Sequence, residues 1–263
     1  HSEFYFLPGI MEGASSELNV VKLKPKDPAF WMYSSGTTGR PKGVIHSQKS
    51  ILSVDDLMGD ILGVGPGDRV YGSSKLFFAF SLAHCFLSPI KLGATVILYP
   101  DWPDAEAVAR IVQRYEPTIL LSVPTFFSNM LRGGIKGKPE FKNVRHYLSA
   151  GEKLPKKLFA QWMAMTGCPI LEGIGATETC FLFLANRPDN VNAGTCGLPT
   201  PGAEVKLIDR DGLVINQPNV PGVLWVKMAS VASGYWRMKE RTMEVFKEGW
   251  YCTNDMFVFN SSG

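Results

Sequence analysis

Hydroxyl-bearing residues and glycines are concentrated between Tyr33 and His46, in the segment YSSGTTGRPKGVIH. Hydroxyls and backbone N–H groups can surround an anion, glycine lets the backbone approach it closely, and a lysine adds positive charge. The segment therefore predicts a phosphate-binding loop with Lys42 beside the phosphate. The other residues of this predicted loop are Ser34, Ser35, Gly36, Thr37, Thr38 and Gly39.

This segment could also be a flexible connector or a Walker loop. A loop rich in Gly, Ser and Thr is often only a flexible connector. It is not a Walker loop, because no Ser or Thr follows Lys42. The apolar run AFWMY before it predicts a buried strand, and residues 47–62 carry apolar side chains at helical spacing. These flanks favour an order of strand, phosphate-binding loop and helix.

The rest of the chain divides into two patterns. From residue 29 to 187, strands and helices alternate, which predicts an α/β fold with a mostly parallel sheet layered with helices on both faces. After about Asn190, helical periodicity nearly vanishes and turn signals separate short strands, which predicts a small antiparallel β-barrel-like subdomain. We expect a partial first α/β subdomain over 1–60, a second over 61–188 and the β subdomain over 189–263.

Composition excludes several classes of protein. With 263 residues, 45% of them hydrophobic, the chain can bury a sizeable core. Its net charge of +3, without a long run of one sign, does not favour a nucleic-acid partner. The five scattered cysteines indicate reduced thiols in a cytoplasmic protein. No uninterrupted apolar run reaches the length of about 20 residues that a membrane span needs, so none is predicted. We interpret the start at His1 as an internal cut or an expression boundary.

Four motifs together resemble the acyl-adenylate-forming, AMP-binding superfamily. They are SSGTTGRPKG from Ser34, SAGE from Ser149, GIGATE from Gly173 and GWYCTNDMF from Gly249. The segments KLFFA, ANRPDN and GTCGLPTPG are similar in sequence to the benzoate-CoA ligase branch of the aryl- and acyl-CoA ligases. The resemblance covers nearly the whole chain, but only the middle of a full enzyme, within its large N-terminal domain.

The resemblance implies a role for each motif. Thr177 would contact phosphate, Glu178 would hold Mg²⁺, and Lys42 would lie near the departing pyrophosphate. Asp255 would bind the ribose hydroxyls, although Asn254 replaces the usual glycine before it; Asn tolerates a left-handed backbone better than most residues. The remaining residues implied for the nucleotide are Ala150, Gly151, Glu152, Glu172, Gly173, Ile174 and Gly175.

The same resemblance implies an acyl pocket. Phe80 and Phe181 stand where benzoate ligases often carry a tyrosine and a histidine, so we expect a more apolar acid than a hydroxybenzoate. Of the histidines, His46 is expected to be structural, and His84 to be a core residue or an edge of this pocket. The residues implied for the acid are Ala79, Phe80, Ser81, Ile174 and Phe181.

The implied reaction activates an aromatic or similar apolar carboxylic acid with ATP and Mg²⁺ as an acyl-AMP, and then forms a thioester with CoA. Two alternatives stay open: an adenylation domain that loads a phosphopantetheinyl carrier, and a nucleotide-binding module without full activity. Because the mobile C-terminal domain of this family would follow residue 263, this polypeptide alone is expected to be poorly active, with the CoA site largely outside it. A homodimer is also left open.

Overall fold

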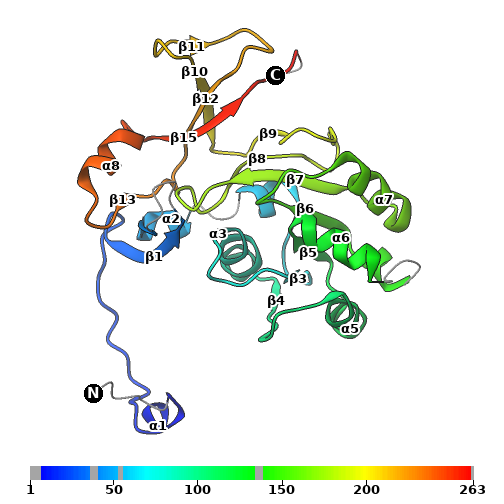
Figure 1. The fold of residues 1–263 in the computed structure, drawn as a ribbon. Coiled ribbons are helices and arrows are strands. Elements are labelled where there is room, and N and C mark those ends of the chain that lie inside the picture. Colours follow the sequence, from blue (N-terminus) through cyan, green and yellow to red (C-terminus); the bar gives the residue numbers. More distant parts are fainter. Residues whose placement is uncertain (1–6, 36–40, 53–55, 134–138, 262–263) are drawn as a thin grey trace.

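Figure 1 shows the computed structural model of the chain, an α/β body below a lobe of antiparallel strands, with an arm that leads away to the N-terminus. The structure describes residues 7–35, 41–52, 56–133 and 139–261. Gly36, Thr37, Thr38 and Gly39 of the predicted phosphate-binding loop lie outside these ranges.

The central sheet has seven strands in the order β4-β3-β5-β6-β7-β8-β9. Neighbours from β4 to β7 are parallel, whereas β8 and β9 join the edge in antiparallel pairing. This confirms the mostly parallel sheet. The strands are β3 (Arg69–Gly72), β4 (Thr95–Ile97), β5 (Ile119–Ser122), β6 (His146–Ser149), β7 (Ile170–Gly175), β8 (Leu182–Ala185) and β9 (Leu198–Pro199).

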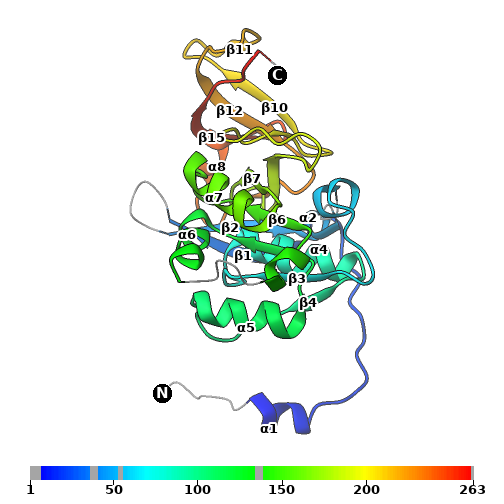
Figure 2. The ribbon, with the colours of Figure 1, turned by 90° about the vertical axis from the view of Figure 1, so that its right-hand side faces the viewer.

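Both faces of this sheet are covered. In β5, Leu120 belongs to one hydrophobic cluster, while Ile119 and Leu121 belong to another on the opposite face, because successive side chains of a strand alternate. The first face is covered by α5 (Ala105–Tyr115), α6 (Pro124–Arg132), η3 (Pro139–Asn143) and α7 (Lys156–Thr166). The second face is covered by the π-helical turns η1 (Asp56–Ile61) and η2 (Leu82–Leu87), beside α3 (Ala79–Ser81) and α4 (Ser88–Lys91). Figure 2 shows α5 lying along the lower side of the body.

Local signals in the sequence account for the helix ends. The Asp104 carboxylate caps α5 by accepting the N–H of Ala107 at 2.7 Å. Gly167 ends α7 in the left-handed conformation, with φ at 73°. Pro124 occupies the first turn of α6, where the N–H that proline lacks would have no partner within the helix.

The predicted order of strand, loop and helix around the phosphate-binding segment is wrong in two respects. The strand before the loop is not buried, because Met32 is its only buried residue and Trp31 and Tyr33 are exposed. A second strand, β2 (Lys42–Ser47), follows the loop and pairs antiparallel with β1 (Pro28–Ser34) before the short helix α2 (Gln48–Leu52). The two strands and β13 (Gly234–Tyr235) form a separate sheet in the order β1-β2-β13, so β1 does not join the parallel sheet. Local periodicity does not reveal β2, because its partners are supplied by other parts of the chain.

The predicted antiparallel subdomain is confirmed as a five-stranded sheet in the order β11-β10-β12-β15-β14, the upper lobe in Figure 1. All its neighbouring strands are antiparallel. The segment after residue 189 also contributes β13 to the three-stranded sheet of β1 and β2. The three predicted subdomain boundaries therefore stay a prediction. Its elements are β10 (Glu204–Ile208), β11 (Val214–Ile215), β12 (Gly222–Lys227), α8 (Lys239–Val245), β14 (Phe246–Lys247) and β15 (Trp250–Phe257).

The arm begins with α1 (Leu7–Glu12) and runs to β1 apart from the body in both views (Figures 1 and 2). Its apolar side chains, such as Leu18 and Val20, are exposed. Within the described ranges, no helix is both long and apolar enough to cross a membrane.

Trp162 should be a main anchor of the α/β core. Its side chain is fully buried, and its ring centroid lies 4.6 Å from that of Phe127 and 5.2 Å from that of Tyr147. Trp162→Ala would leave a large cavity, so we expect the free energy of unfolding to fall by about 3–5 kcal/mol in urea denaturation. Met163→Ala, at the half-exposed neighbour in the same helix, is the control and should cost less than about 1 kcal/mol. Equal losses would show that Trp162 does not anchor the core.

Candidate active site

The loop that follows β7 is held by three donors from elsewhere in the chain. Its successive carbonyls at Thr177, Glu178 and Thr179 accept hydrogen bonds from the His46 ring at 2.8 Å, the Ala232 N–H at 2.8 Å and the Ser230 hydroxyl at 2.6 Å. Because Nε2 of His46 faces a carbonyl oxygen, that nitrogen carries the proton. The loop is thus tied both to β2 and to the segment before β13.

The side chains of Lys42 and Glu178 meet at this junction. Lys42 Nζ lies 3.1 Å from Glu178 Oε1, and both side chains are largely buried, at 14% and 6% exposed. The Tyr235 hydroxyl donates to the same Oε1 at 2.7 Å and accepts from Lys42 Nζ at 3.2 Å. The structure therefore brings Lys42, at the end of the predicted phosphate-binding loop, to the Thr177–Glu178 pair.

Burial and charge shift the titrations at this junction. Burial lowers the pKa of His46, so its imidazole is neutral at pH 7 and can make the single donation to Thr177. Burial, followed by the negative charge of Glu178, raises the pKa of the Tyr235 phenol, which therefore keeps its proton. Burial and Glu178 also raise the pKa of Tyr251.

The first two residues of the predicted phosphate-binding loop are described. Ser34 ends β1 opposite Lys42 in the β1–β2 register. Its buried Oγ has no hydrogen-bond partner in the described part of the chain, whereas Ser35 is exposed. A buried hydroxyl without a partner next to a lysine is suited to bind an anionic group.

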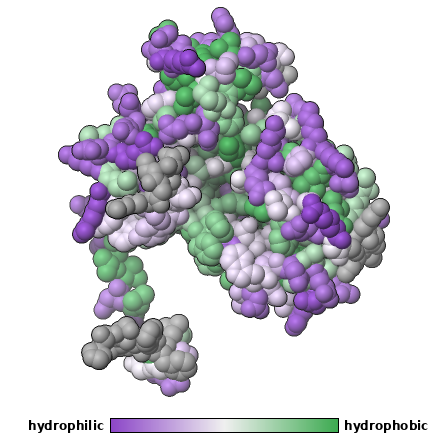
Figure 3. Space-filling view, viewed as in Figure 1, coloured by the Kyte–Doolittle hydropathy of each residue, from purple (hydrophilic) through white to green (hydrophobic). Residues whose placement is uncertain are grey.

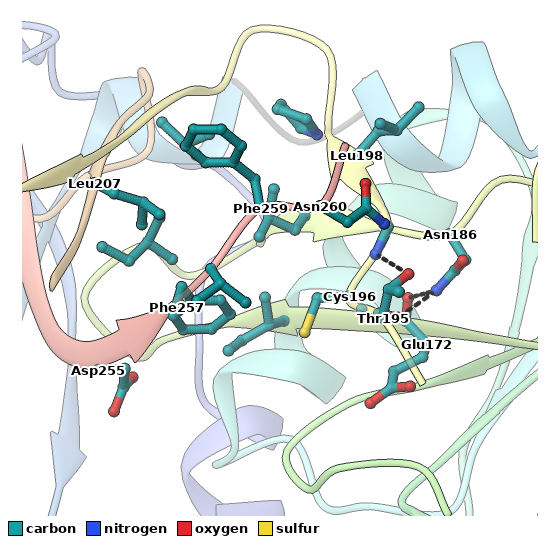
Figure 4. Close-up of a pocket in the computed structure, with 18 of the residues that line it drawn as sticks. Glu172, Asn186, Thr195, Cys196, Leu198, Leu207, Asp255, Phe257, Phe259 and Asn260 are labelled. Atoms are coloured by element: carbon teal, nitrogen blue, oxygen red, sulfur yellow. Dashed lines mark hydrogen bonds between the residues drawn. The ribbon is translucent and has the colours of Figure 1, made fainter. Parts of the chain in front are cut away.

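A cavity of about 1020 Å³ lies between the central sheet and the five-stranded sheet. Figure 3 shows hydrophobic side chains along the recess beneath the upper lobe, and Figure 4 shows the cavity walls. Residues from β7 to β9 form one side and residues from β10 to β15 the other. Of the residues implied for the nucleotide, the cavity is lined by Gly151, Glu152, Glu172, Gly173, Ile174, Gly175 and Asp255. Ala150 is instead 2% exposed in a core cluster and does not line it.

Glu172 offers an unused acceptor to this cavity. Its Oε1 accepts the Leu154 N–H at 2.9 Å, while the buried Oε2 has no partner among the described residues. Burial raises the pKa of this carboxyl group. The neighbouring Gly175 needs its small size, because a Cβ there would lie 2.8 Å from the Phe181 carbonyl oxygen.

Asp255 lies on β15, across the cavity from Glu172 (Figure 4). Partial burial, followed by repulsion from Glu178, raises the pKa of its carboxyl group. Asn254 has φ at 62°, so the asparagine adopts the left-handed conformation that the usual glycine would take, as the sequence predicts.

The residues implied for the acid lie mostly around His84. The His84 ring centroid is 5.8 Å from that of Phe80 and 5.4 Å from that of Phe181. Its Nε2 accepts the Leu182 N–H at 3.2 Å, and burial lowers its pKa to about 3, so the ring is neutral. Ala79 and Ser81 belong to α3 in the same segment, with Ser81 buried, and Ile174 lines the cavity.

Tyr235 and Ser230 were missed by sequence reasoning. Tyr235 is 193 residues from Lys42 along the chain and 57 from Glu178. No spacing rule connects residues so far apart. The short apolar stretch around Tyr235, between turns, could only have indicated a strand.

Comparison with known proteins supplies the family. The profile of the family described as "AMP-binding enzyme" matches residues 7–236. The 3-hydroxybenzoate-CoA/4-hydroxybenzoate-CoA ligase of Thauera aromatica is 46% identical over 253 residues, which are 96% of this chain and 48% of that protein. The benzoate-CoA ligase of the same organism is 36% identical over 98% of this chain and 49% of that protein. The chain spans about half the length of the curated relatives it matches.

Solved structures agree with the sequence relatives. A benzoate-CoA ligase from Burkholderia xenovorans LB400 superposes with a TM-score of 0.89 at 33% identity, covering 97% of this chain and 51% of that one. The anthranilate-CoA ligase AuaEII, in complex with anthranoyl-AMP, superposes with a TM-score of 0.92 at 29% identity, covering 98% and 50%. Both carry the fold described above. Since the family profile matches most of the length of this chain, the chain belongs to the AMP-binding enzyme family.

Proposed function

We propose that this chain is the nucleotide- and acid-binding part of an aryl-CoA ligase, which joins an aromatic carboxylic acid to AMP and then to the thiol of CoA. The observation that carries the proposal is the contact of Lys42 with Glu178 at 3.1 Å. It joins the end of the Ser/Thr/Gly-rich segment to the Thr177–Glu178 loop, which directly follows β7, a strand whose residues 172–175 line a cavity of about 1020 Å³. The names of the relatives support CoA as the acceptor.

The nucleotide would occupy the cavity between the two sheets. The unpartnered Oε2 of Glu172 is an acceptor suited to an amino group such as that of adenine. Asp255, on the opposite wall, can accept hydrogen bonds from the two ribose hydroxyls. The phosphates would then extend toward Ser34, Thr177 and Lys42.

Glu178 fits a site for Mg²⁺. Its carboxylate already accepts a cationic ammonium group, and Mg²⁺ is commonly held by one or two carboxylates together with substrate phosphates. In the described ranges no group of three or more His, Cys, Asp or Glu side chains could hold a metal ion by itself, which agrees with a site that phosphates complete. The bound ion would neutralise phosphate charge.

The chemistry of the first step is an encounter between two anions. A carboxylate oxygen of the acid would attack the α-phosphorus, the bond to the bridging oxygen of the β-phosphate would break, and pyrophosphate would leave. Lys42 would stabilise the growing negative charge on pyrophosphate, while the hydroxyls of Ser34 and Thr177 orient phosphate oxygens. In the second step the thiol sulfur would attack the acyl carbon, AMP would leave and the thiol proton would be released.

The acid would lie with its ring near Phe80 and Phe181. Both side chains are aromatic and lie against the neutral ring of His84, so the surroundings of an acid bound here would be mainly apolar. An aromatic ring is therefore the acyl group that the site best accommodates.

Binding of an acyl-adenylate analogue tests the proposal directly. The benzoyl sulfamoyl adenosine analogue, titrated into this chain by calorimetry, should bind at least about tenfold more tightly than AMP, because it fills the acid and nucleotide sites together. The analogue with a long unbranched acyl chain is the matched control and should gain less over AMP. If neither the benzoyl analogue nor AMP binds, the proposed function is wrong.

The same titration tests the acid specificity. We expect the benzoyl analogue to bind at least as tightly as the 3- and 4-hydroxybenzoyl analogues, because Phe80 and Phe181 offer no hydrogen bond to a ring hydroxyl. Tighter binding of a hydroxybenzoyl analogue would contradict the prediction of an apolar acid. It would assign a polar role to Nδ1 of His84, which has no hydrogen-bond partner in the described ranges.

The proposed ribose contact predicts a pH dependence of AMP binding. The ionised form of Asp255 accepts from the ribose, and its pKa is raised, so AMP affinity should fall on acidification at a higher pH than for an ordinary aspartate. Titrations from pH 7.5 to 5 measure this, with 2′,3′-dideoxy-AMP as the control ligand. The affinity for AMP should depend more strongly on pH than the affinity for 2′,3′-dideoxy-AMP, and Asp255→Asn should abolish this difference. A pH dependence that is identical for both nucleotides would exclude the Asp255–ribose contact.

A further inference from the structure

We infer that Tyr235 is a positioning residue that fixes the Glu178 carboxylate for metal-assisted adenylation. The inference rests on the proposed function. It assigns a role to a residue outside the four motifs, in the two-residue strand β13.

The three polar groups form a closed triangle. The Tyr235 hydroxyl is 2.7 Å from Glu178 Oε1, Lys42 Nζ is 3.1 Å from that oxygen, and the hydroxyl and Nζ are 3.2 Å apart. The contacts with Tyr235 and Lys42 both fall on Oε1, and the Tyr251 phenol also faces this carboxylate. By holding Oε1, Tyr235 would fix the orientation in which the carboxylate meets a cation.

Protonation decides the direction of each bond. The ionised carboxylate only accepts and the ammonium group only donates, so the phenol must donate to Glu178 and accept from Lys42. A tyrosine phenol carries its proton at neutral pH, so Tyr235 can supply this donor. The Tyr251 phenol also faces Glu178.

The backbone and ring of Tyr235 are held independently of Glu178. Tyr235 pairs with Val44 in the β2–β13 register, and its N–H donates to the Thr242 hydroxyl at 3.0 Å. Its ring packs edge to face against Phe246 at 5.4 Å between centroids, and Lys42 Nζ lies 4.5 Å from its ring centroid. A hydroxyl on such a fixed ring can position a carboxylate without moving itself.

The triangle gives Tyr235 a role that Lys42 cannot fill. During the reaction Lys42 is needed at the phosphates, so its bond to Glu178 must weaken when the nucleotide binds. The Tyr235 bond can persist through this exchange, since the hydroxyl has no competing role at the phosphates. Tyr235 would then keep the Glu178 carboxylate oriented to hold a metal ion after the ammonium group has turned to the phosphates.

Tyr235→Phe tests the inference, because it removes the hydroxyl and keeps the ring. Calorimetric titration of the chain with ATP would be carried out with Mg²⁺ and with EDTA. We expect affinity for ATP with Mg²⁺ to fall about tenfold, the effect of losing one hydrogen bond to a charged group, and affinity in EDTA to change less than about twofold. Glu178→Gln should abolish most of the gain in ATP affinity that Mg²⁺ gives over EDTA. The double variant of Tyr235→Phe and Glu178→Gln should bind ATP with Mg²⁺ only slightly more weakly than Glu178→Gln alone.

Tyr147→Phe is the matched control, because the Tyr147 phenol is also buried and donates to a carbonyl, that of Phe141, in the core away from the site. Its ATP affinity should match that of the unaltered chain with or without Mg²⁺. Equal loss of affinity by Tyr235→Phe in Mg²⁺ and in EDTA, or no loss at all, would overturn the positioning role. If the unaltered chain binds no ATP under either condition, the proposed function itself fails.

Discussion

The attachment of the loop after β7 to β2 and β13 is the constraint on which the site depends. Three consecutive carbonyls, at residues 177–179, accept hydrogen bonds from two separate segments, β2 and residues 230–232, and the ion pair of Lys42 with Glu178 forms beside them. Burying two opposite charges costs solvation, which their attraction offsets only when geometry is good and further hydrogen bonds are made. The Tyr235 hydroxyl makes those bonds to both charges.

The parallel sheet is the scaffold for this attachment. Its strands end at one edge, where the loops after β6 and β7 carry Gly151, Glu152 and Thr177. In open parallel sheets, ligands bind at this edge because several loops can converge there. The antiparallel sheet supplies the other wall, with Asp255 on β15. The cavity thus depends on segments from residue 151 to residue 260, and neither sheet encloses it alone.

Elements with local signals could be predicted from the sequence. The cap at Asp104, the left-handed Gly167 and the buried run of β5 depend on neighbouring residues, so the residue types within each segment indicate them. β2 could not be predicted, because its pairing with β1 and β13 is a non-local interaction. The motifs pointed to residues that line the cavity but included Ala150, which is buried in a core cluster and does not line it. Tyr235 belonged to no recognised motif, and its partners, Lys42 on β2 and Glu178 in the loop after β7, are distant from it in the sequence.

The position of the cavity between two sheets has a consequence for the stability of the protein. A small molecule that contacts both walls would stabilise the folded state, because the sheets could not separate without releasing it. By mass action, each tenfold excess of such a molecule over its dissociation constant would add about 1.4 kcal/mol to the folded state. The melting temperature of this protein would then report the concentration of its own substrates.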